Sequence, residues 1–490
     1  MKKRAILYFS VILFLMCSRT VSNGSNLDDE LIEKIRSDFQ MDTHTRAIYN
    51  AITNTDIKTL AINRDLLREH NEFFSNKIKV KGISDQAKSG RCWLFAALNS
   101  IRQHTIKKNR LKKLDFSHIY LTFWDKMEKA NTFYERMIEF RDRDMMDREL
   151  VHLLKKPLPD GGYWENAKDL IQKYGIVPKE VMPETHSSNN TAMMNHIIER
   201  KMRVDAVKLR DMAKKQKSVE QMRKAKEEML AEVYHLLVMN LGEPPIKFDW
   251  RYEPVDKSDD KDEEDNEGDG NEEDDEDVDE EYIDKSIIIK DYTPKQFYDE
   301  FVGLDLDEYL DICNDTTHPV GRRYQLVLTR NLYDGHDLDY ANVDIETLKD
   351  AAIKSLIDST PLWFSVDVGV DQDRDKGVML ENLYDYGSIF NVDLDMTKEQ
   401  LALFRQNTPN HAMNLVGVDI QDGRPVKWLV ENSWGSEKGS KGRWVMYDNW
   451  FDMNVYGIIV KKQYLPEEVV DIFEQAPIKL PVWDPMWQRK

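Results

Sequence analysis

The stretch DQAKSGRCWLFAALNSIRQHTIKKN, residues 85–109, decides the fold. Its first six residues, 85–90, are mostly polar and end in Gly90, which is typical of a turn. A largely apolar run follows from Cys92 to Ile101, and it predicts a buried helix that begins at Cys92. The stretch therefore places a thiol at the amino end of a core helix.

Outward from this helix the chain divides into a helical half and a strand-rich half. Further helices are predicted from periodicity and composition at residues 27–80, 117–155, 160–185 and 190–240. Short strand-like runs bounded by Gly, Asp or Asn occur at residues 361–370, 411–420, 427–435, 442–451 and 456–462. Helices followed by strands indicate an α+β fold.

This pattern divides the 490 residues into segments, because the chain is too long for one ordinary domain. We predict a signal segment at 1–22, an N-terminal helical region at 23–80, a catalytic domain at 81–477 and a C-terminal arm at 478–490. Within the catalytic domain we predict a helical insertion at about 155–240 and a disordered acidic loop at 255–282.

Acidic charge is concentrated in that loop. Residues 256–281 hold 18 acidic and two basic residues, so the rest of the chain carries only −4 of the net charge of −20. Part of the loop nearly matches a calcium-binding EF-hand, but Glu267 stands where Asp or Asn is expected, so loose association of cations is the simpler interpretation. The net charge opposes a nucleic-acid partner, and the basic residues of 190–240 are better explained as a solvated helical face.

The amino terminus has the pattern of an export signal. Three basic residues at positions 2–4 precede a 13-residue apolar run that ends at Cys17, which is too short to span a bilayer. We therefore expect a periplasmic or secreted protein. Lipidation of Cys17 is the alternative to cleavage of the segment, and only lipidation would attach the protein to a membrane.

Three further residues point to nucleophilic catalysis by Cys92. A helix amino terminus favours a thiolate, although an apolar-flanked cysteine is by itself more often inert core. His411 begins one strand-like run, and Asn432 ends the next, so a hairpin can bring a base and its orienting group together. Gln86 is placed to donate to an oxyanion together with the backbone N–H of Cys92. The indole of Trp434 is expected to shield the His–Asn hydrogen bond and to contact substrate.

The segments DQAKSGRCWLF, NHAMNLVGVD and VENSWG resemble the papain-like cysteine peptidases. Arg91 precedes the cysteine, and His411 follows it by 319 residues rather than the roughly 130–150 of papain. Both features resemble the bleomycin hydrolase and aminopeptidase C family. The resemblance implies a papain-like fold, with Cys92 as nucleophile, His411 as general acid/base, Asn432 as orienting residue and Gln86 as oxyanion donor.

The resemblance also implies a homohexameric ring and a C-terminal arm that lies in the active-site cleft. In the family the terminal carboxylate meets the α-ammonium of the peptide, which would be the carboxylate of Lys490 here. After Trp483–Met486, however, this chain ends in Trp487, Gln488, Arg489 and Lys490, which are bulkier and more basic than the family's usual ending. The assignment of Lys490 depends on how far this altered ending follows the family.

The sequence thus predicts an exported cysteine aminopeptidase that acts on peptides from the free amino terminus. No cofactor or metal is predicted, since the chain has no HExxH-type run and no cysteine pair at ligand spacing. Two alternatives remain open. A papain-like endopeptidase would result if the altered arm left the cleft open, and a noncatalytic ring scaffold is the alternative outside the enzyme class.

Overall fold

The computed structural model describes residues 26–255 and 286–487, which form two compact units. The smaller unit comprises residues up to Ile62 together with Tyr384–Val392. Its helices are α1 (Asp29–Asp38), α2 (Thr43–Asn54), α3 (Ile57–Ala61) and α14 (Tyr386–Phe390). The carboxylates of Asp28, Asp42 and Asp56 cap the first three helices by accepting from backbone N–H groups.

The larger unit begins at Asn63, whereas the sequence-based boundary lies at residue 80. Residues 63–80 belong to this unit because β1 (Asn76–Lys77) pairs with β10 (His411–Gln421). The unit's first helices are α4 (Arg64–Glu69), α5 (Cys92–Asn109), α6 (His118–Glu139), α7 (Arg148–Lys155), α8 (Trp164–Tyr174), α9 (His186–Asn189), α10 (Ala192–Lys214) and α11 (Val219–Leu241). Later helices are α12 (Pro294–Gln296), α13 (Ile345–Ile357), α15 (Lys398–Leu403), α16 (Asp448–Asn454) and α17 (Glu467–Val470).

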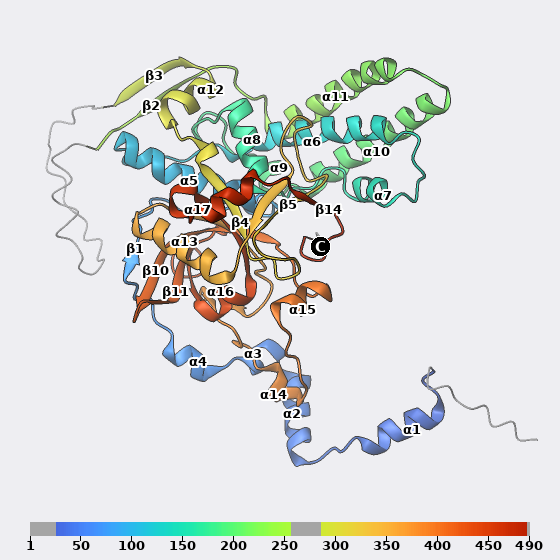
Figure 1. Ribbon diagram of the computed structural model, residues 1–490, viewed down its shortest axis with the longest axis vertical. Coiled ribbons are helices and arrows are strands. Elements are labelled where there is room, and N and C mark those ends of the chain that lie inside the picture. The colour runs from blue at the N-terminus through green and yellow to red at the C-terminus, as the bar shows by residue number, and fades with distance from the viewer. Residues whose placement is uncertain (1–25, 256–285, 488–490) are drawn as a thin grey trace, which may run out of the picture. The chain divides into compact units, whose positions relative to one another are not determined.

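A mixed sheet forms the other half of this unit (Figure 1). Its strand order is β14-β5-β6-β4-β13-β7-β10-β11-β12-β9-β8, with β1 paired to β10. The remaining bounds are β4 (Tyr309–Cys313), β5 (Arg322–Leu326), β6 (Leu338–Asn342), β7 (Leu362–Val366), β8 (Gln372–Asp373), β9 (Val378–Met379), β11 (Arg424–Glu431), β12 (Arg443–Tyr447), β13 (Val455–Lys461) and β14 (Ile478–Leu480). Helices and a sheet together confirm the predicted α+β class.

Helix α5 is fixed against the centre of the sheet by buried polar contacts. The indole of Trp363 on β7 donates to the carbonyl of Trp93 at 3.0 Å, and the amide of Asn414 on β10 donates to the carbonyl of Ala96 at 3.0 Å. Arg102 forms a fully buried 2.7 Å ion pair with Glu431 on β11. The amino end of α5 is therefore held next to the strands that carry His411 and Asn432.

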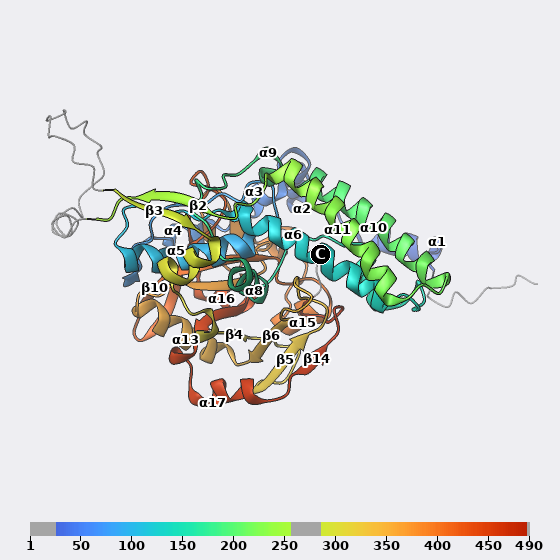
Figure 2. The same ribbon diagram turned by 90° about the horizontal axis from the view of Figure 1, so that it is seen from above.

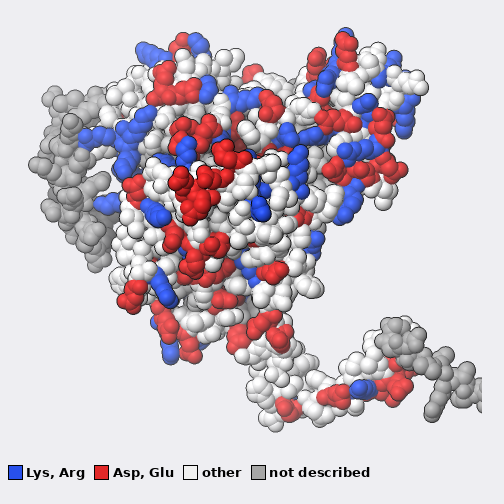
Figure 3. Space-filling model, in the orientation of Figure 1, with Lys and Arg blue, Asp and Glu red and all other residues white. Residues whose placement is uncertain are grey.

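Helices α6, α10 and α11 lie side by side (Figure 2), and α10 and α11 fall within the range of about 155–240 expected for the helical insertion. Their basic residues are interspersed with acidic ones on the face drawn in Figure 3. Several form ion pairs within or between the helices, such as Lys201 with Asp205 and with Glu232. These contacts agree with the solvated-face interpretation of the basic residues.

Strands β2 (Phe248–Tyr252) and β3 (Ile287–Tyr292), which precede and follow the acidic run in the sequence, pair antiparallel. The acidic loop itself, the signal segment, Cys17 and Lys490 lie outside the described residues. Over residues 26–255 and 286–487, no helix is both long and apolar enough to cross a bilayer.

Candidate active site

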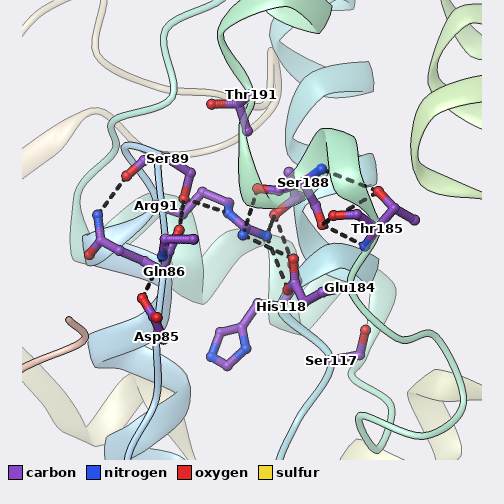
Figure 4. A network of polar contacts seen from close by, with 12 residues as sticks. Asp85, Gln86, Ser89, Arg91, Ser117, His118, Glu184, Thr185, Ser188 and Thr191 are labelled. Atoms are coloured by element: carbon purple, nitrogen blue, oxygen red, sulfur yellow. Dashed lines mark hydrogen bonds and ion pairs between the residues drawn. The ribbon is translucent and has the colours of Figure 1, made fainter. Parts of the chain in front are cut away.

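Cys92 is the first residue of α5 and carries a free, partly buried thiol. The neighbouring Arg91 is buried and lies beside Glu184 and Ser188, as Figure 4 shows. Its guanidinium donates to both carboxylate oxygens of Glu184, at 3.1 and 3.0 Å, and to the carbonyl of Ser188 at 2.9 Å. Arg91 therefore anchors the turn before α5 instead of placing its charge beside the thiol.

Gln86 is held in that turn by contacts at both ends of its amide. Nε2 donates to the carbonyl of Ser89 at 2.6 Å, and Oε1 accepts from the hydroxyl of Ser433 at 2.7 Å. The backbone N–H of Gln86 also donates to the carbonyl of Ser433 at 2.9 Å. The turn that precedes Cys92 is thus tied to the segment that follows Asn432.

The hairpin of β10 and β11 brings His411 and Asn432 together, as the sequence predicts. His411 is the first residue of β10, and Asn432 directly follows β11. Nε2 of His411 lies 2.9 Å from Oδ1 of Asn432, and the same oxygen accepts from the N–H of Ser433 at 2.8 Å. Since Oδ1 only accepts, Nε2 carries the proton and Nδ1 remains the basic nitrogen.

Cys92, His411 and Gln86 line one cavity of about 440 Å³. The N–H of Ala412, next to His411, donates to the sulfur of Cys92. The ring of Trp434 lies 4.8 Å from that of His411, between centroids, but Trp434 is not among the residues that line the cavity. The structure therefore places Trp434 as a cover for the imidazole, and its contact with substrate stays a prediction.

Burial determines the protonation states of the two central groups. Burial raises the pKa of Cys92 to about 11, although the N–H groups of Ala412, Trp93 and Cys92 itself oppose the shift. Burial likewise lowers the pKa of His411 to about 4, against the effect of the hydrogen bond with Asn432. Burial therefore outweighs the effect of the helix terminus on the thiol, and both shifts favour the neutral thiol and the neutral imidazole.

The cavity wall also contains Asp160, which the sequence reasoning did not single out. Its carboxylate accepts from Lys126 at 2.6 Å, from the hydroxyl of Thr191, from the amide of Asn195 at 2.6 Å and from the N–H of Gly90 at 3.2 Å. Burial by itself would raise the pKa of Asp160, but these donors hold it well below its usual range. In the sequence, the two glycines Gly161 and Gly162 directly after Asp160 are the feature that could have indicated this wall of the cavity.

Gly162 allows the wall to approach the nucleophile. A Cβ at this position would come within 2.7 Å of the indole of Trp93, the residue after Cys92. The same indole donates to the carbonyl of Asp160 at 2.8 Å. The loop 160–162 therefore fixes the side of the cavity next to α5.

The C-terminal arm reaches the cavity. Trp487 lines it and donates from its indole to the hydroxyl of Tyr340 at 3.2 Å. The carbonyl of Met486 accepts from the hydroxyl of Thr408 at 3.2 Å. The arm is thus anchored to the body as far as Trp487, three residues before Lys490.

In the described parts of the chain, no group of three or more His, Cys, Asp or Glu residues is placed to hold a metal ion. Cys313, the second thiol of the described residues, is free and fully buried, as expected of a structural thiol.

Three comparisons agree with this geometry. The family model described as "Peptidase C1-like family" matches residues 26–266 and 273–487. Aminopeptidase C of Lactobacillus helveticus is 34% identical over 94% of this chain and 98% of its own length, and Aminopeptidase C of Listeria monocytogenes is 37% identical over 84% and 87%. The crystal structure of PepW from Lactobacillus rhamnosis HN001 superposes with a TM-score of 0.86 at 36% identity, covering 94% of this chain and 99% of PepW.

Proposed function

The chain belongs to the Peptidase C1-like family and has the cysteine aminopeptidase function of its relatives, and we propose that Cys92, His411, Asn432 and Gln86 perform the reaction. The observation that carries this proposal is the cavity shared by Cys92, His411 and Gln86, together with the 2.9 Å contact of His411 with Asn432.

The reaction begins when the sulfur of Cys92 attacks the carbonyl carbon and its proton passes to Nδ1 of His411. Because both groups are neutral beforehand, the transfer creates the two charges as a close pair, which is easier to bury than either charge alone. The N–H of Cys92 and Nε2 of Gln86 stabilise the oxyanion. His411 then protonates the leaving amine, and water, deprotonated by His411, hydrolyses the thioester.

The arm supports selectivity for free amino termini. It occupies the cavity wall as far as Trp487, and only three residues separate Trp487 from the terminal carboxylate of Lys490. A carboxylate in a cleft of reduced dielectric attracts the α-ammonium of a peptide and leaves little room for further residues before the scissile bond.

We also propose that the protein is exported and assembles as a homohexamer. The basic and apolar pattern of residues 2–17 supports export, with lipidation of Cys17 as the variant that would anchor it. The resemblance to the bleomycin hydrolase family supports the ring. Mass spectrometry of the mature amino terminus and sedimentation analysis test these two statements.

The test of the activity uses one peptide in a free and an N-acetylated form, under reducing conditions, with Cys92→Ala as control. Stepwise loss of amino-terminal residues from the free peptide alone is expected. Internal cuts in both peptides would establish an endopeptidase with an open cleft. No cleavage of either peptide would overturn the catalytic proposal in favour of a scaffold.

A further inference from the structure

A second carboxylate, that of Asp311 on β4, also lines the catalytic cavity. The side chain is only 6% exposed, and its only hydrogen bond among the described residues is a 3.4 Å contact from the thiol of Cys313. No lysine, arginine or histidine of the described residues forms an ion pair with it. A buried carboxylate is normally paired or strongly hydrogen-bonded, so the lack of a cationic partner calls for an explanation.

Further carboxyl groups lie near Asp311. Glu165 of α8 lies close enough to interact with Asp311 electrostatically, and its Oε2 atom is buried without a partner in the described chain. Asp339 is also near, but Arg323 neutralises it through two contacts of 2.7 and 2.9 Å. Burial raises the pKa of Asp311 to about 7, the thiol of Cys313 opposes the shift, and Asp339 adds to it. A cation that entered the cavity would favour the ionised form of Asp311 and would bind to it.

The strand order sets the distance at which such a cation would lie from the nucleophile. His411 is on β10 and Asp311 on β4, with β7 and β13 between them. Three strand spacings of about 4.8 Å separate the two strands by roughly 14 Å, and the register places Asp311 level with Asn414, three residues along β10 from His411. The α-ammonium of a peptide is only two bonds from the carbonyl carbon under attack, so it stays near His411. A long side chain is required to reach Asp311.

The route between the two sites is lined by groups that suit such a side chain. Trp363, Leu338, Tyr163 and Trp487 line the same cavity and provide apolar and aromatic surface. Methylene groups of lysine or arginine pack on surface of this kind while the charged end reaches a carboxylate.

We propose that Asp311 is a specificity-determining residue, which selects peptides whose residue before the scissile bond is arginine or lysine. This inference rests on the proposed function, since it assigns a subsite of the same cavity. The guanidinium or ammonium group binds the Asp311 carboxylate, with Glu165 behind it, and the side-chain stem lies along the aromatic wall.

The test compares kcat/KM for arginine and citrulline aminomethylcoumarin amides, which have side chains of nearly equal shape and different charge. The wild-type enzyme is expected to prefer arginine at least tenfold, and Asp311→Asn is expected to remove most of this ratio. Asp375→Asn is the matched control, because Asp375 is exposed and forms its one ion pair within the described residues with Lys438, and it should keep the ratio. A wild-type enzyme that cleaves both amides equally would overturn the inference without any variant. Cleavage of neither amide would instead count against the proposed function.

The chain's own tail also offers cationic side chains to Asp311, since Arg489 and Lys490 follow Trp487. The variant Arg489→Gln/Lys490→Gln separates the two sources. If the substrate side chain binds Asp311, the arginine preference and its loss in Asp311→Asn persist in this background. If the effect of Asp311→Asn disappears in this background, the carboxylate holds the tail and the proposal is wrong.

Discussion

Two carboxylates line the catalytic cavity, and they differ in how the protein satisfies them. Asp160 accepts from Lys126, Thr191, Asn195 and the backbone of Gly90. Asp311 has only a thiol as a hydrogen-bond partner within the described residues. Burial opposes ionisation of both groups, yet the pKa of Asp160 is held below its usual range while that of Asp311 is raised to about 7.

The difference teaches which kind of carboxylate serves the structure and which remains available to a ligand. Asp160 is saturated, and it holds the turn before Cys92 and the indole of Trp93 in place. Asp311 gains nothing comparable from the protein, so a substrate cation is the partner that would stabilise its charge. The same chemical group thus has a positioning role on one wall and a recognition role on the other.

The largest effect is expected from removal of the thiol that shares the cavity with both carboxylates. Cys92→Ala should lower kcat/KM by at least about 10⁴-fold, since covalent catalysis is lost. In this background Asp160→Asn and Asp311→Asn should cause no further loss, which steady-state assays of the double variants check. A variant with retained activity would place the nucleophile elsewhere.

Replacement of Asp160, whose carboxylate is fully hydrogen-bonded, should mainly lower the free energy of unfolding. Asp160→Asn leaves the buried ammonium of Lys126 unpaired, so the free energy of unfolding should fall by about 3 kcal/mol. Urea denaturation measures this change, and Asp160→Asn/Lys126→Met should recover part of it because no lone charge remains. Equal free energies of unfolding for Asp160→Asn and wild type would contradict the structural role assigned to Asp160 in its comparison with Asp311.

Removal of the Asn432 amide tests how strongly this amide acts on the imidazole of His411. The hydrogen bond with Asn432 raises the pKa of His411 against the effect of burial. Asn432→Ala should therefore move the pKa further below about 4 and lower kcat/KM about 10- to 100-fold. The acidic limb of the pH–rate profile should shift to lower pH, whereas a loss of activity with an unchanged limb would indicate a purely structural role.

The smallest effect is expected from neutralising the unsatisfied carboxylate, and its sign is opposite to that of Asp160→Asn. The folded-state pKa of Asp311 is about 7, so between pH 4 and 7 the unfolded chain releases a proton that the folded protein keeps. Wild-type stability therefore decreases across this window as the pH rises. Asp311→Asn should be more stable than wild type at pH 8, and the difference in the free energy of unfolding should shrink towards pH 4.5 in urea titrations. A less stable variant at pH 8 would show that the carboxylate is satisfied after all.

The local pattern of apolar residues was sufficient to predict the helix and the strands that carry the predicted catalytic residues. The apolar run after Cys92 predicts α5, and the strand-like runs that contain His411 and Asn432 predict β10 and the end of β11. Their side chains meet because adjacent antiparallel strands lie next to each other, which sequence order alone implies.

Tertiary burial accounts for what the sequence could not show. Asp311 lies in a buried strand, where a charged residue breaks the pattern that identifies strands, so neither β4 nor its carboxylate was predicted. The pKa of Cys92 depends on desolvation by distant segments, which outweighs the helix terminus that the sequence does reveal. The family resemblance implied that the C-terminal arm lies in the cleft, but the position of Trp487 there depends on long-range packing, through its contact with Tyr340.

The central claim, that Cys92 is the nucleophile of this cavity, is tested most directly by covalent labelling. The protein is treated with an epoxide inhibitor of thiol peptidases, and the labelled residue is identified by peptide mass spectrometry. The account predicts one label per chain, on Cys92 and not on the buried Cys313, with loss of activity in proportion to labelling. Full labelling of Cys92 with activity retained, or inactivation with the label on another residue, would contradict it.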